Sequence, residues 1–577
     1  MARWQVAQSD PELQDRLVGP LGISPITAQV LINRGIVDPD LADRFLHPTL
    51  HQLHDPFLLP DMEQAVTRLM TAIAQREAIV ICGDYDTDGV CGAALLWRFF
   101  RMVGAQVGVD IPHRSDGYGL QVETVRRLHA GGAQLLVTID NGSTARDALA
   151  EAARLGVPVL VTDHHEPGAS LPPAVAVINP KRAESRYPFR GLCGTGVAFK
   201  LIMALRQRLR ACGWFESCTE PNLRPLLDLV AVATVADVVP LIDENRLLVA
   251  VGMRQLAQSA WAGLRALMEV AQIDPTRLST YTLGFQIGPR LNAAGRMAHA
   301  QTAAELLMTD DAATAVRLAQ EVHTLNTERQ ATEQAIRTAV DVRLQQRGDV
   351  SVRSSIVMAD PAWPSGVIGI VAGRIAEQYR LPTILIGIEG EWGRGSARSV
   401  GNFPLLEAIA ACAQHLERYG GHRAAAGVTV RAEWVDAFAG RFEEEATMRL
   451  TAADREKQLS VDALVVPESL SLALAQELAQ LGPFGLGNPE PLLLLQQQVV
   501  IRRRIVGRNH LQLHLQGNPQ PLQAIAFSHG EHPAAAAECL DLVFTPTPNT
   551  WNGSVQLQLQ VRDLRAAERR EKIDTVR

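Results

Sequence analysis

Short aliphatic runs alternate with segments of helical period between about residues 62 and 180. The helical stretches, such as GAALLWRFFRMV and STARDALAEAARLG, repeat their apolar positions every three or four residues. Strands that alternate with helices in this way predict βαβ units and a buried parallel sheet. We therefore expect an α/β domain over residues 61–300, with a mostly helical part at 197–272. Its predicted strands are 78–82, 107–112, 135–139, 157–162 and 174–178.

A long amphipathic segment follows this domain. Residues 302–347 keep the helical period and contain no glycine or proline. We assign a connecting long helix to residues 301–350, which at ~1.5 Å per residue would span ~65 Å between two domains. A helical hairpin is the alternative. A second mixed α/β domain is expected at 351–452, with strands in SSIVMA, TILIGI and GVTV.

The two ends of the chain have different patterns. Residues 1–60 are polar and punctuated by prolines, which is typical of a small leader packed on the residues that follow. In residues 453–577, Gln-rich segments such as LQLHLQ and SVQLQLQV alternate apolar and polar positions. This alternation suits the half-buried strands of a small C-terminal β-barrel.

Composition narrows the class of protein. The 577 residues are enough for three or four domains of roughly 150 residues. Hydrophobic residues make up 47% and charged residues 20%, which excludes a mainly disordered or collagenous chain. No stretch reaches the ~18 uncharged apolar residues of a membrane helix. Seven cysteines without a CxxC pair indicate a cytoplasmic protein and exclude a Cys-based zinc site.

Acidic and imidazole side chains follow several predicted strands. Because ligands bind at the carboxyl ends of strands in an open parallel sheet, we expect these side chains to meet at one edge. A solvated acidic turn and a structural His pair are the alternatives for each motif taken alone. The residues at the three strand ends are Asp84, Asp86 and Asp88 in GDYDTDG, Asp140 in TIDNG, and Asp163, His164 and His165 in VTDHHEP. A further acid, Asp237, lies in ATVADVVPL.

Such a cluster of carboxylates repels itself unless a cation compensates the charge. Asp237 also interrupts an aliphatic run, where an unpaired buried carboxylate costs several kcal/mol. Oxygen ligands with imidazole favour Mn²⁺ or Mg²⁺ over metals that prefer thiolates. Two such ions ~3.5–4 Å apart, bridged by one carboxylate, would suit phosphoester hydrolysis.

These motifs resemble those of the DHH phosphoesterase superfamily, and GGHRAAAG at 420–427 resembles its DHH-associated domain. The length, the GFQIGPRLNAAGRM segment and the β-rich tail are similar to the bacterial single-strand-specific 5′→3′ exonucleases of that superfamily. The resemblance implies a parallel-sheet DHH domain joined by the long helix to the DHH-associated domain. It also implies an oligonucleotide-binding (OB) type barrel in the tail.

Carried over residue by residue, the resemblance makes Asp86, Asp88, Asp140, His164 and Asp237 the metal ligands, with Asp140 as the bridge. Asp84 and Asp163 are either ligands or acids that orient their neighbours. His165 would face the scissile phosphate. Cys82 stands where many superfamily phosphatases have a His, so the first ion has fewer protein ligands. The choice between Mg²⁺ and Mn²⁺ stays open.

Arginines and small residues supply candidate phosphate contacts, since Arg forms bidentate bonds with phosphate. The resemblance places Arg290 and Asn292 on the phosphate side of the cleft. The alternatives for the arginine motifs are structural: ion pairing with the acidic cluster, a tight hairpin, or a solvated arginine strand. The DNA-binding candidates are Arg114, Ser396 and Arg398 for the 5′ end, Arg296, Gly420, Gly421 and His422 in the cleft, and Arg502, Arg503, Arg504 and Arg508 in the barrel.

The net charge of −7 does not by itself suggest a nucleic-acid binder. The resemblance nevertheless implies a monomeric enzyme that degrades single-stranded DNA to mononucleotides in repair and recombination. It implies a single-strand-binding protein and a RecQ-type helicase as partners, and no membrane. There are two other readings: a phosphodiesterase for short oligonucleotides or cyclic dinucleotides, and an inactive replication scaffold. The long tail argues against the phosphodiesterase reading. The complete set of motif acids argues against the scaffold reading.

Overall fold

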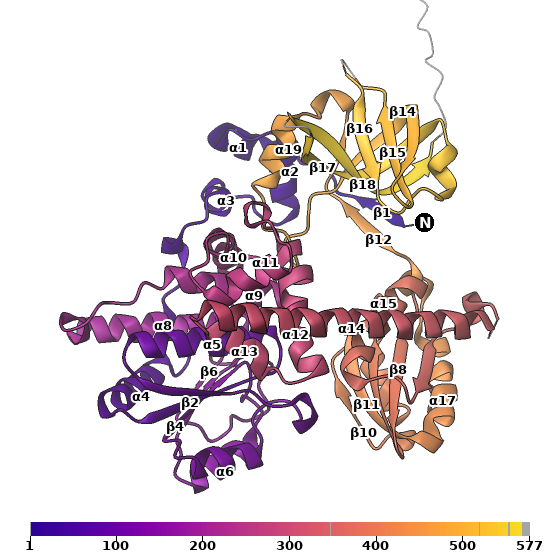
Figure 1. Ribbon diagram of the computed structural model, residues 1–577. Helices are drawn as coiled ribbons and strands as arrows, with labels where there is room; N and C mark the ends of the chain where they lie inside the picture. The colour runs from indigo at the N-terminus through magenta and orange to yellow at the C-terminus, as the bar shows by residue number, and fades with distance from the viewer. Residues whose placement is uncertain (1, 347, 518–519, 552–553, 568–577) are drawn as a thin grey trace, which may run out of the picture. The chain divides into compact units, whose positions relative to one another are not determined.

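The computed structural model describes residues 2–346, 348–517, 520–551 and 554–567 (Figure 1). The chain divides into two compact units. One, here called the catalytic unit, comprises Leu53–Val239 and Asp243–Glu456. The other, here called the barrel unit, comprises Met1–Gln52, Pro240–Ile242 and Lys457–Arg577. In the described residues, no helix is both long and apolar enough to cross a membrane.

The catalytic unit contains the expected parallel sheet. Its five strands lie in the order β3-β2-β4-β5-β6, and every pair is parallel. Because β3 and β4 flank β2 on opposite sides, the strand order reverses next to β2, where open α/β sheets bind ligands. The strands are β2 (Ala78–Gly83), β3 (Gln106–Asp110), β4 (Leu135–Ile139), β5 (Val159–Thr162) and β6 (Ala176–Ile178).

Helices surround this sheet and continue beyond it as the expected helical part. Helix α4 (Met62–Gln75) precedes the first strand, and the helices between strands are α5 (Thr87–Met102), α6 (Val122–Ala130) and α7 (Arg146–Arg154). The later ones are α8 (Gly194–Ala211), α9 (Leu227–Ala236), α10 (Asp243–Leu256), α11 (Ala262–Val270), α12 (Gly288–Met297) and α13 (Gln301–Met308).

The connecting helix is α14 (Ala312–Gln346), which runs from the helices around α12 to the second sheet (Figure 1). Its 35 residues correspond to ~52 Å. The expectation of one helix from residue 301 was wrong, because α13 ends at Met308 and Thr309 is extended. The Asp311 carboxylate accepts a hydrogen bond from Thr314 N (2.8 Å), so a new helix begins there.

The second sheet has the strand order β10-β11-β9-β8-β7, and only the β7–β8 pair is parallel. Sequence analysis missed β9 and β10. In β9, a side chain at Gly393 or Gly395 would lie within 3 Å of Ile386 or Val428, so glycine replaces the usual strand residues. The elements are β7 (Ile356–Asp360), α15 (Ser365–Tyr379), β8 (Thr383–Glu389), β9 (Trp392–Arg398), α16 (Leu405–Ala410), β10 (Arg418–Gly421), β11 (Ala425–Arg431) and α17 (Val435–Arg449).

The barrel unit holds the predicted C-terminal barrel. Strand β14 pairs with β15 on one side and with β17 on the other, which closes five strands into a ring. The ring consists of β14 (Leu493–Val506), β15 (His510–Leu515), β16 (Leu522–Ala526), β17 (Cys539–Trp551) and β18 (Ser554–Ala566). Ahead of it lie β12 (Gln458–Val461), β13 (Ala463–Val465) and α19 (Leu472–Ala479).

Most of the N-terminal segment, Met1–Gln52, belongs to this barrel unit. Its last residues, from Leu53, belong to the catalytic unit, where the turn Pro56–Leu58 contacts α4 and α8. Strand β1 (Arg3–Val6) pairs in parallel with β12. Helices α1 (Pro11–Leu21), α2 (Pro25–Asn33) and α3 (Pro39–Leu46) contribute Leu17 and Leu31 to the same core as Leu493 and Phe544. The pairing of the N-terminal segment with the C-terminal part of the chain was not predicted, because contacts between residues so far apart leave no local sequence signal.

Candidate active site

The first acidic loop connects β2 to α5. Asp86 is the N-cap of α5, and its carboxylate accepts hydrogen bonds from Asp88 N (3.0 Å) and Gly89 N (3.2 Å). Both oxygens of Asp88 accept backbone N–H bonds at the start of α8, from Gly194 (2.6 Å) and Thr195 (2.8 Å). The loop is therefore held rigid at the carboxyl end of β2.

The second and third loops follow β4 and β5. Asp140 has a left-handed backbone (φ 63°). A side chain at Gly194 would lie 2.8 Å from its Cβ, so only glycine allows this approach. The Asp163 carboxylate accepts bonds from Ser143 N (2.9 Å), His164 N (2.8 Å) and the His165 ring Nδ1 (2.9 Å). With its oxygens in use, Asp163 orients the His pair.

The three loops and the end of α9 bring their side chains together. His164 Nε2 lies 3.0 Å from Asp140 Oδ1, 3.5 Å from Asp237 Oδ2 and 3.8 Å from Asp88 Oδ2. Three overlapping groups could each hold a cation, since one ligand atom from each member lies within 4.8 Å of the others. They are Asp84, Asp86 and Asp140; Asp88, His164 and Asp237; and Asp140, His164 and His165.

Several of these atoms are buried without a partner. Among the described residues, Asp84 Oδ1, Asp140 Oδ1, His164 Nε2 and Asp237 Oδ2 are buried side-chain atoms with no hydrogen bond. A buried polar atom without a partner costs about 1–3 kcal/mol, and more when charged. Bound cations would supply the missing partners of these four atoms. The donor set of carboxylates and imidazole fits Mn²⁺ or Mg²⁺.

The electrostatics indicate the same need for positive charge. Burial, and then the neighbouring Asp86, raises the pKa of Asp84 to about 8. Burial, and then Asp88, raises the pKa of Asp237 to about 9. The pKa values of Asp86 and Asp140 also rise through burial and then neighbouring carboxylates. Without a cation, the folded protein holds protons on these acids that free carboxyls would release.

The surroundings of His164 and His165 shift their pKa values in opposite directions. Burial lowers the pKa of His164, which favours the neutral ring that a metal requires. Burial acts to lower the pKa of His165 too, but its hydrogen bond with Asp163 more than offsets this, and the pKa rises. The same bond, with backbone donors, holds the pKa of Asp163 well below its usual range despite burial. His165 is therefore suited to carry a proton.

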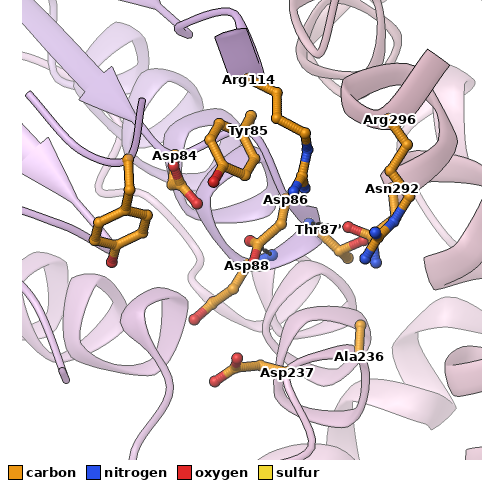
Figure 2. Close-up of a pocket in the computed structure, with 11 residues that line it drawn as sticks. Asp84, Tyr85, Asp86, Thr87, Asp88, Arg114, Ala236, Asp237, Asn292 and Arg296 are labelled. Atoms are coloured by element: carbon orange, nitrogen blue, oxygen red, sulfur yellow. Dashed lines mark hydrogen bonds between the residues drawn. The ribbon is translucent and has the colours of Figure 1, made fainter. Parts of the chain in front are cut away.

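A pocket of about 310 Å³ opens over the cluster (Figure 2). The carboxylates of Asp84, Asp86, Asp88 and Asp237 line one part of it. Arg114, Asn292 and Arg296 line the other part, so the pocket offers both cation ligands and positive charge.

Comparisons with known proteins agree with this site. Three stretches match family descriptions: residues 78–234 the N-terminal domain of the DHH family, 349–447 the DHHA1 domain, and 461–563 the RecJ OB domain. The chain is 35% identical to the single-stranded-DNA-specific exonuclease RecJ of Bacillus subtilis over 98% of this chain and 71% of that protein. The chain belongs to the RecJ family of single-stranded-DNA-specific exonucleases.

Solved RecJ structures share the fold. RecJ from Thermus thermophilus in complex with Mn²⁺ has a TM-score of 0.84 and 33% identity, covering 98% of this chain and 80% of that one. The same protein in complex with Mg²⁺ has a TM-score of 0.78 and 31% identity, covering 98% and 79%. Both ions that the donor set favours therefore occur in RecJ structures.

The two predicted phosphate contacts on α12, Arg290 and Asn292, lie in different surroundings in the structure. Asn292 lies in the acidic pocket, where its side-chain oxygen accepts a hydrogen bond from Thr87 N (2.9 Å) and fixes the first acidic loop. Arg290 does not line this pocket. Its Nε donates to His323 Nδ1 (3.1 Å) on α14, and its Nη1 donates to Gln286 O (2.6 Å). The geometry brings Asn292, but not Arg290, to the acidic cluster.

A basic cluster adjoins the pocket. Burial, and then the charges of Arg114, Arg329 and Arg398, lower the pKa of Arg296 to about 10. Arg296 Nη1 donates to Gly366 O (2.9 Å) in α15, and Arg398 Nη1 donates to Ser396 Oγ (3.0 Å) beside the same helix. Sequence analysis missed Arg329, because an arginine on a long polar helix has no distinguishing sequence signal.

The remaining candidates lie elsewhere. Gly420 and Gly421 lie on the exposed edge strand β10, and His422 follows them. Arg502, Arg503 and Arg504 are exposed on β14, and Arg508 lies in the turn between β14 and β15 of the barrel unit. None of these seven residues lines the acidic pocket.

Proposed function

We propose that this protein hydrolyses single-stranded DNA from the 5′ end, releases mononucleotides, and uses two divalent cations, Mn²⁺ or Mg²⁺. The observation that carries the proposal is the convergence of four buried ligand atoms without a hydrogen bond, from Asp84, Asp140, His164 and Asp237. Asp86 and Asp88 complete the ligand set. Asp140 belongs to two of the three candidate groups, which suits a bridging carboxylate.

When bound, two such ions would lower the pKa of a water molecule and screen the charge of the phosphodiester. The chain's own residues do the rest. Asp163 holds both histidines in place, and His165, whose pKa that contact raises, would face the phosphate as a donor or acid. Arg114 and Arg296 provide fixed positive charge on the other part of the pocket.

The direction of cleavage would come from a terminal phosphate site. Ser396 and Arg398 lie together beside α15, next to Arg296 and its hydrogen bond to that helix. A hydroxyl, a guanidinium and a basic neighbour suit a 5′-phosphate, and Arg114 would contribute from the pocket side. A blocked terminus would then set the product to a single nucleotide.

The DNA strand would be held further by the other candidate contacts. These are the glycine-flanked His422, with Gly420 and Gly421, and the arginines Arg502, Arg503, Arg504 and Arg508 of the barrel. The match of residues 461–563 to the RecJ OB domain supports the barrel's role. We place the activity in DNA repair and recombination in the cytoplasm, as a monomer assisted by a single-strand-binding protein and a RecQ-type helicase.

The test uses a 3′-labelled single strand and the same strand as a blunt duplex, each with Mg²⁺ or Mn²⁺. We expect a ladder of shortening labelled products from the single strand only, abolished by EDTA. Asp86→Ala and Asp140→Ala should fold yet lose hydrolysis, whereas Asp436→Ala, an exposed acid on α17, should retain it. Immediate release of the label as a mononucleotide would mean the opposite polarity. Activity retained in both site variants would refute the metal assignment.

A further inference from the structure

Two aromatic side chains lie exposed ahead of α12. Tyr281 is 63% exposed and Phe285 is 68% exposed. Their rings stack on each other, with centroids 5.0 Å apart and planes 22° from parallel. Each ring thus covers part of its partner and leaves a flat apolar surface open to solvent. Exposed aromatic surface of this kind commonly marks a binding site.

The backbone beneath them is also unusual. Phe285 lies in a π-helix, η7 (Thr282–Ile287), a rare form that is frequent at functional sites. The side of η7 without aromatics is packed tightly, because an added Cβ at Gly284 would lie 3.3 Å from Val235, and one at Gly288 3.0 Å from Ala236. Helix α9 therefore fixes η7 and presents the two rings outward.

This segment is continuous with the metal site. Helix η7 runs directly into α12, and Thr87 Oγ1 in the first acidic loop donates to Gly288 O (3.0 Å) at the junction. Asn292 of the acidic pocket follows Phe285 by seven residues, which is ~10 Å along a helix axis. This spacing suits a base next to the phosphodiester at the metal site.

A cation is held at the residue that follows Phe285. Arg290 donates from Nη1 to Gln286 O, which brings its guanidinium back to the residue after Phe285. Its bond to His323 Nδ1 holds it there from α14. Burial lowers the pKa of Arg290, but Arg stays protonated at neutral pH. An apolar stacking surface next to a held guanidinium matches a nucleobase next to its phosphate.

We propose that Tyr281 and Phe285 form a stacking platform for one nucleobase of the DNA strand, with Arg290 facing the adjoining phosphodiester. The inference rests on the proposed function. Every base has a π-face, so the platform accepts any sequence. In a duplex both faces of each base are covered by neighbouring base pairs. The platform therefore favours single strands by stacking, separately from any steric exclusion.

The test places 2-aminopurine at successive positions of a single-stranded oligonucleotide bound in EDTA, where hydrolysis stops. Stacking on a ring quenches this base, so we expect one position to be quenched by the wild-type protein. Phe285→Ala and Tyr281→Ala should lose the quenching and raise Kd about tenfold or more. Phe285→Trp should restore both. Met448→Ala, which removes a side chain that is 66% exposed on α17, should leave both unchanged.

An abasic site gives an independent readout. With the base removed at the quenched position, wild type and Phe285→Ala should bind equally, since the contact is already absent. Equal loss on normal and abasic strands, or no loss at all, would overturn the platform. Wild-type protein that fails to cleave single strands with either metal would instead refute the proposed function. If it cleaves but shows no quenching at any position, only the platform fails.

Discussion

Six carboxylates and two imidazoles gather at this site, and backbone hydrogen bonds hold three of the carboxylates in place. Backbone N–H groups fix Asp86, Asp88 and Asp163, so rotamer freedom contributes little to their arrangement. Asp84, Asp140 and Asp237 instead keep unpartnered oxygens. The cost of assembling the site is thus mainly electrostatic, and it should respond to protons and cations.

The first prediction concerns pH and metal removal. In EDTA, the free energy of unfolding of the catalytic unit should rise as pH falls from 9 to 7. The pKa values of Asp84 (about 8) and Asp237 (about 9) lie above the ~3.9 of an unfolded Asp, so in this range only the folded state binds protons. Denaturant unfolding at several pH values measures how the free energy of unfolding changes with pH.

Two controls sharpen that measurement. Asp237→Asn removes one of the titrating groups and should flatten the slope. Saturating Mn²⁺ should stabilise the wild type more at pH 9 than at pH 7, because the cation replaces protons on the same oxygens. Stability that rises with pH in EDTA would contradict the assignment of these raised pKa values.

The second prediction separates a positioning acid from the ligands. Asp163→Asn should raise the Mn²⁺ concentration needed for activity by about 10–100-fold, because outer partners of ligating histidines tune metal affinity by this factor. The Asn NH₂ group cannot accept the bond from Ser143 N that the carboxylate accepts. A Mn²⁺ titration, with calorimetry of metal binding, measures the shift.

Asp110→Asn is the matched control, since Asp110 also ends a strand of the same sheet but pairs with Arg127 (2.8 Å). Its metal requirement should stay at the wild-type value. Complete loss of Asp163→Asn activity at any Mn²⁺ concentration would indicate that Asp163 is itself a ligand.

At the level of elements, the close approach of α8 to the β4 loop shapes the site. Gly194 N donates to Asp88, and its missing side chain leaves room for Asp140. One backbone position thus sets the distance between two acidic loops. The start of α8 is as much a part of the site as the loops that carry the acids.

The third prediction follows from that contact. Gly194→Ala should reduce metal-dependent hydrolysis about 100-fold, because the new Cβ would lie 2.9 Å from Asp140 Oδ1 and must displace it. Overpacking should also cost about 1–3 kcal/mol of stability. Gly108→Ala on β3, where nothing lies within 4 Å, should change neither quantity much. Wild-type activity in Gly194→Ala would show that Asp140 tolerates displacement.

The sequence predicted elements best where one local pattern dominates. Aliphatic runs located β2 to β6. Because ligands bind at the carboxyl ends of parallel strands, the acids and histidines that follow these strands were expected at one edge of the sheet. Strand β9 was missed because Gly393 and Gly395 replace branched residues where neighbouring side chains need the space. The break before α14 was missed because the capping residue, Asp311, cannot be told from any other polar residue of a helix in the sequence. The Tyr281–Phe285 pair was also missed, since the sequence does not show whether two aromatics four residues apart on a helix face the core or the solvent.

At the scale of the whole molecule, the barrel unit is assembled from both ends of the chain. Leu17, Leu31 and Leu46 share a core with the barrel strands, and Trp4 Nε1 donates to Asp563 Oδ2 (2.7 Å). No sequence pattern indicates such a pairing, because periodicity reports which face of an element is apolar but not what covers it. The N-terminal segment is thus a structural part of the barrel.

The fourth prediction tests this arrangement. Leu31→Ala should destabilise the barrel unit by about 2–5 kcal/mol, the usual cost of truncating a fully buried leucine. Amide hydrogen exchange should accelerate in β14–β18 and stay unchanged in β2–β6. Leu41→Ala, which removes a side chain that is 54% exposed on α3, should have little effect. Faster exchange in β2–β6 alone would contradict the division into units.

The pairing of β1 with β12 also governs how the molecule is made. About 400 residues must be translated between the N-terminal helices and their partners, which at 5–20 residues per second takes roughly 20–80 s. During that time the catalytic unit, which lies between them, emerges and can close. The apolar faces of α1, α2 and α3 meanwhile stay uncovered on the nascent chain. A ribosome that stops early therefore leaves the metal site finished and the N-terminal helices without a core, as a target for chaperones and proteases.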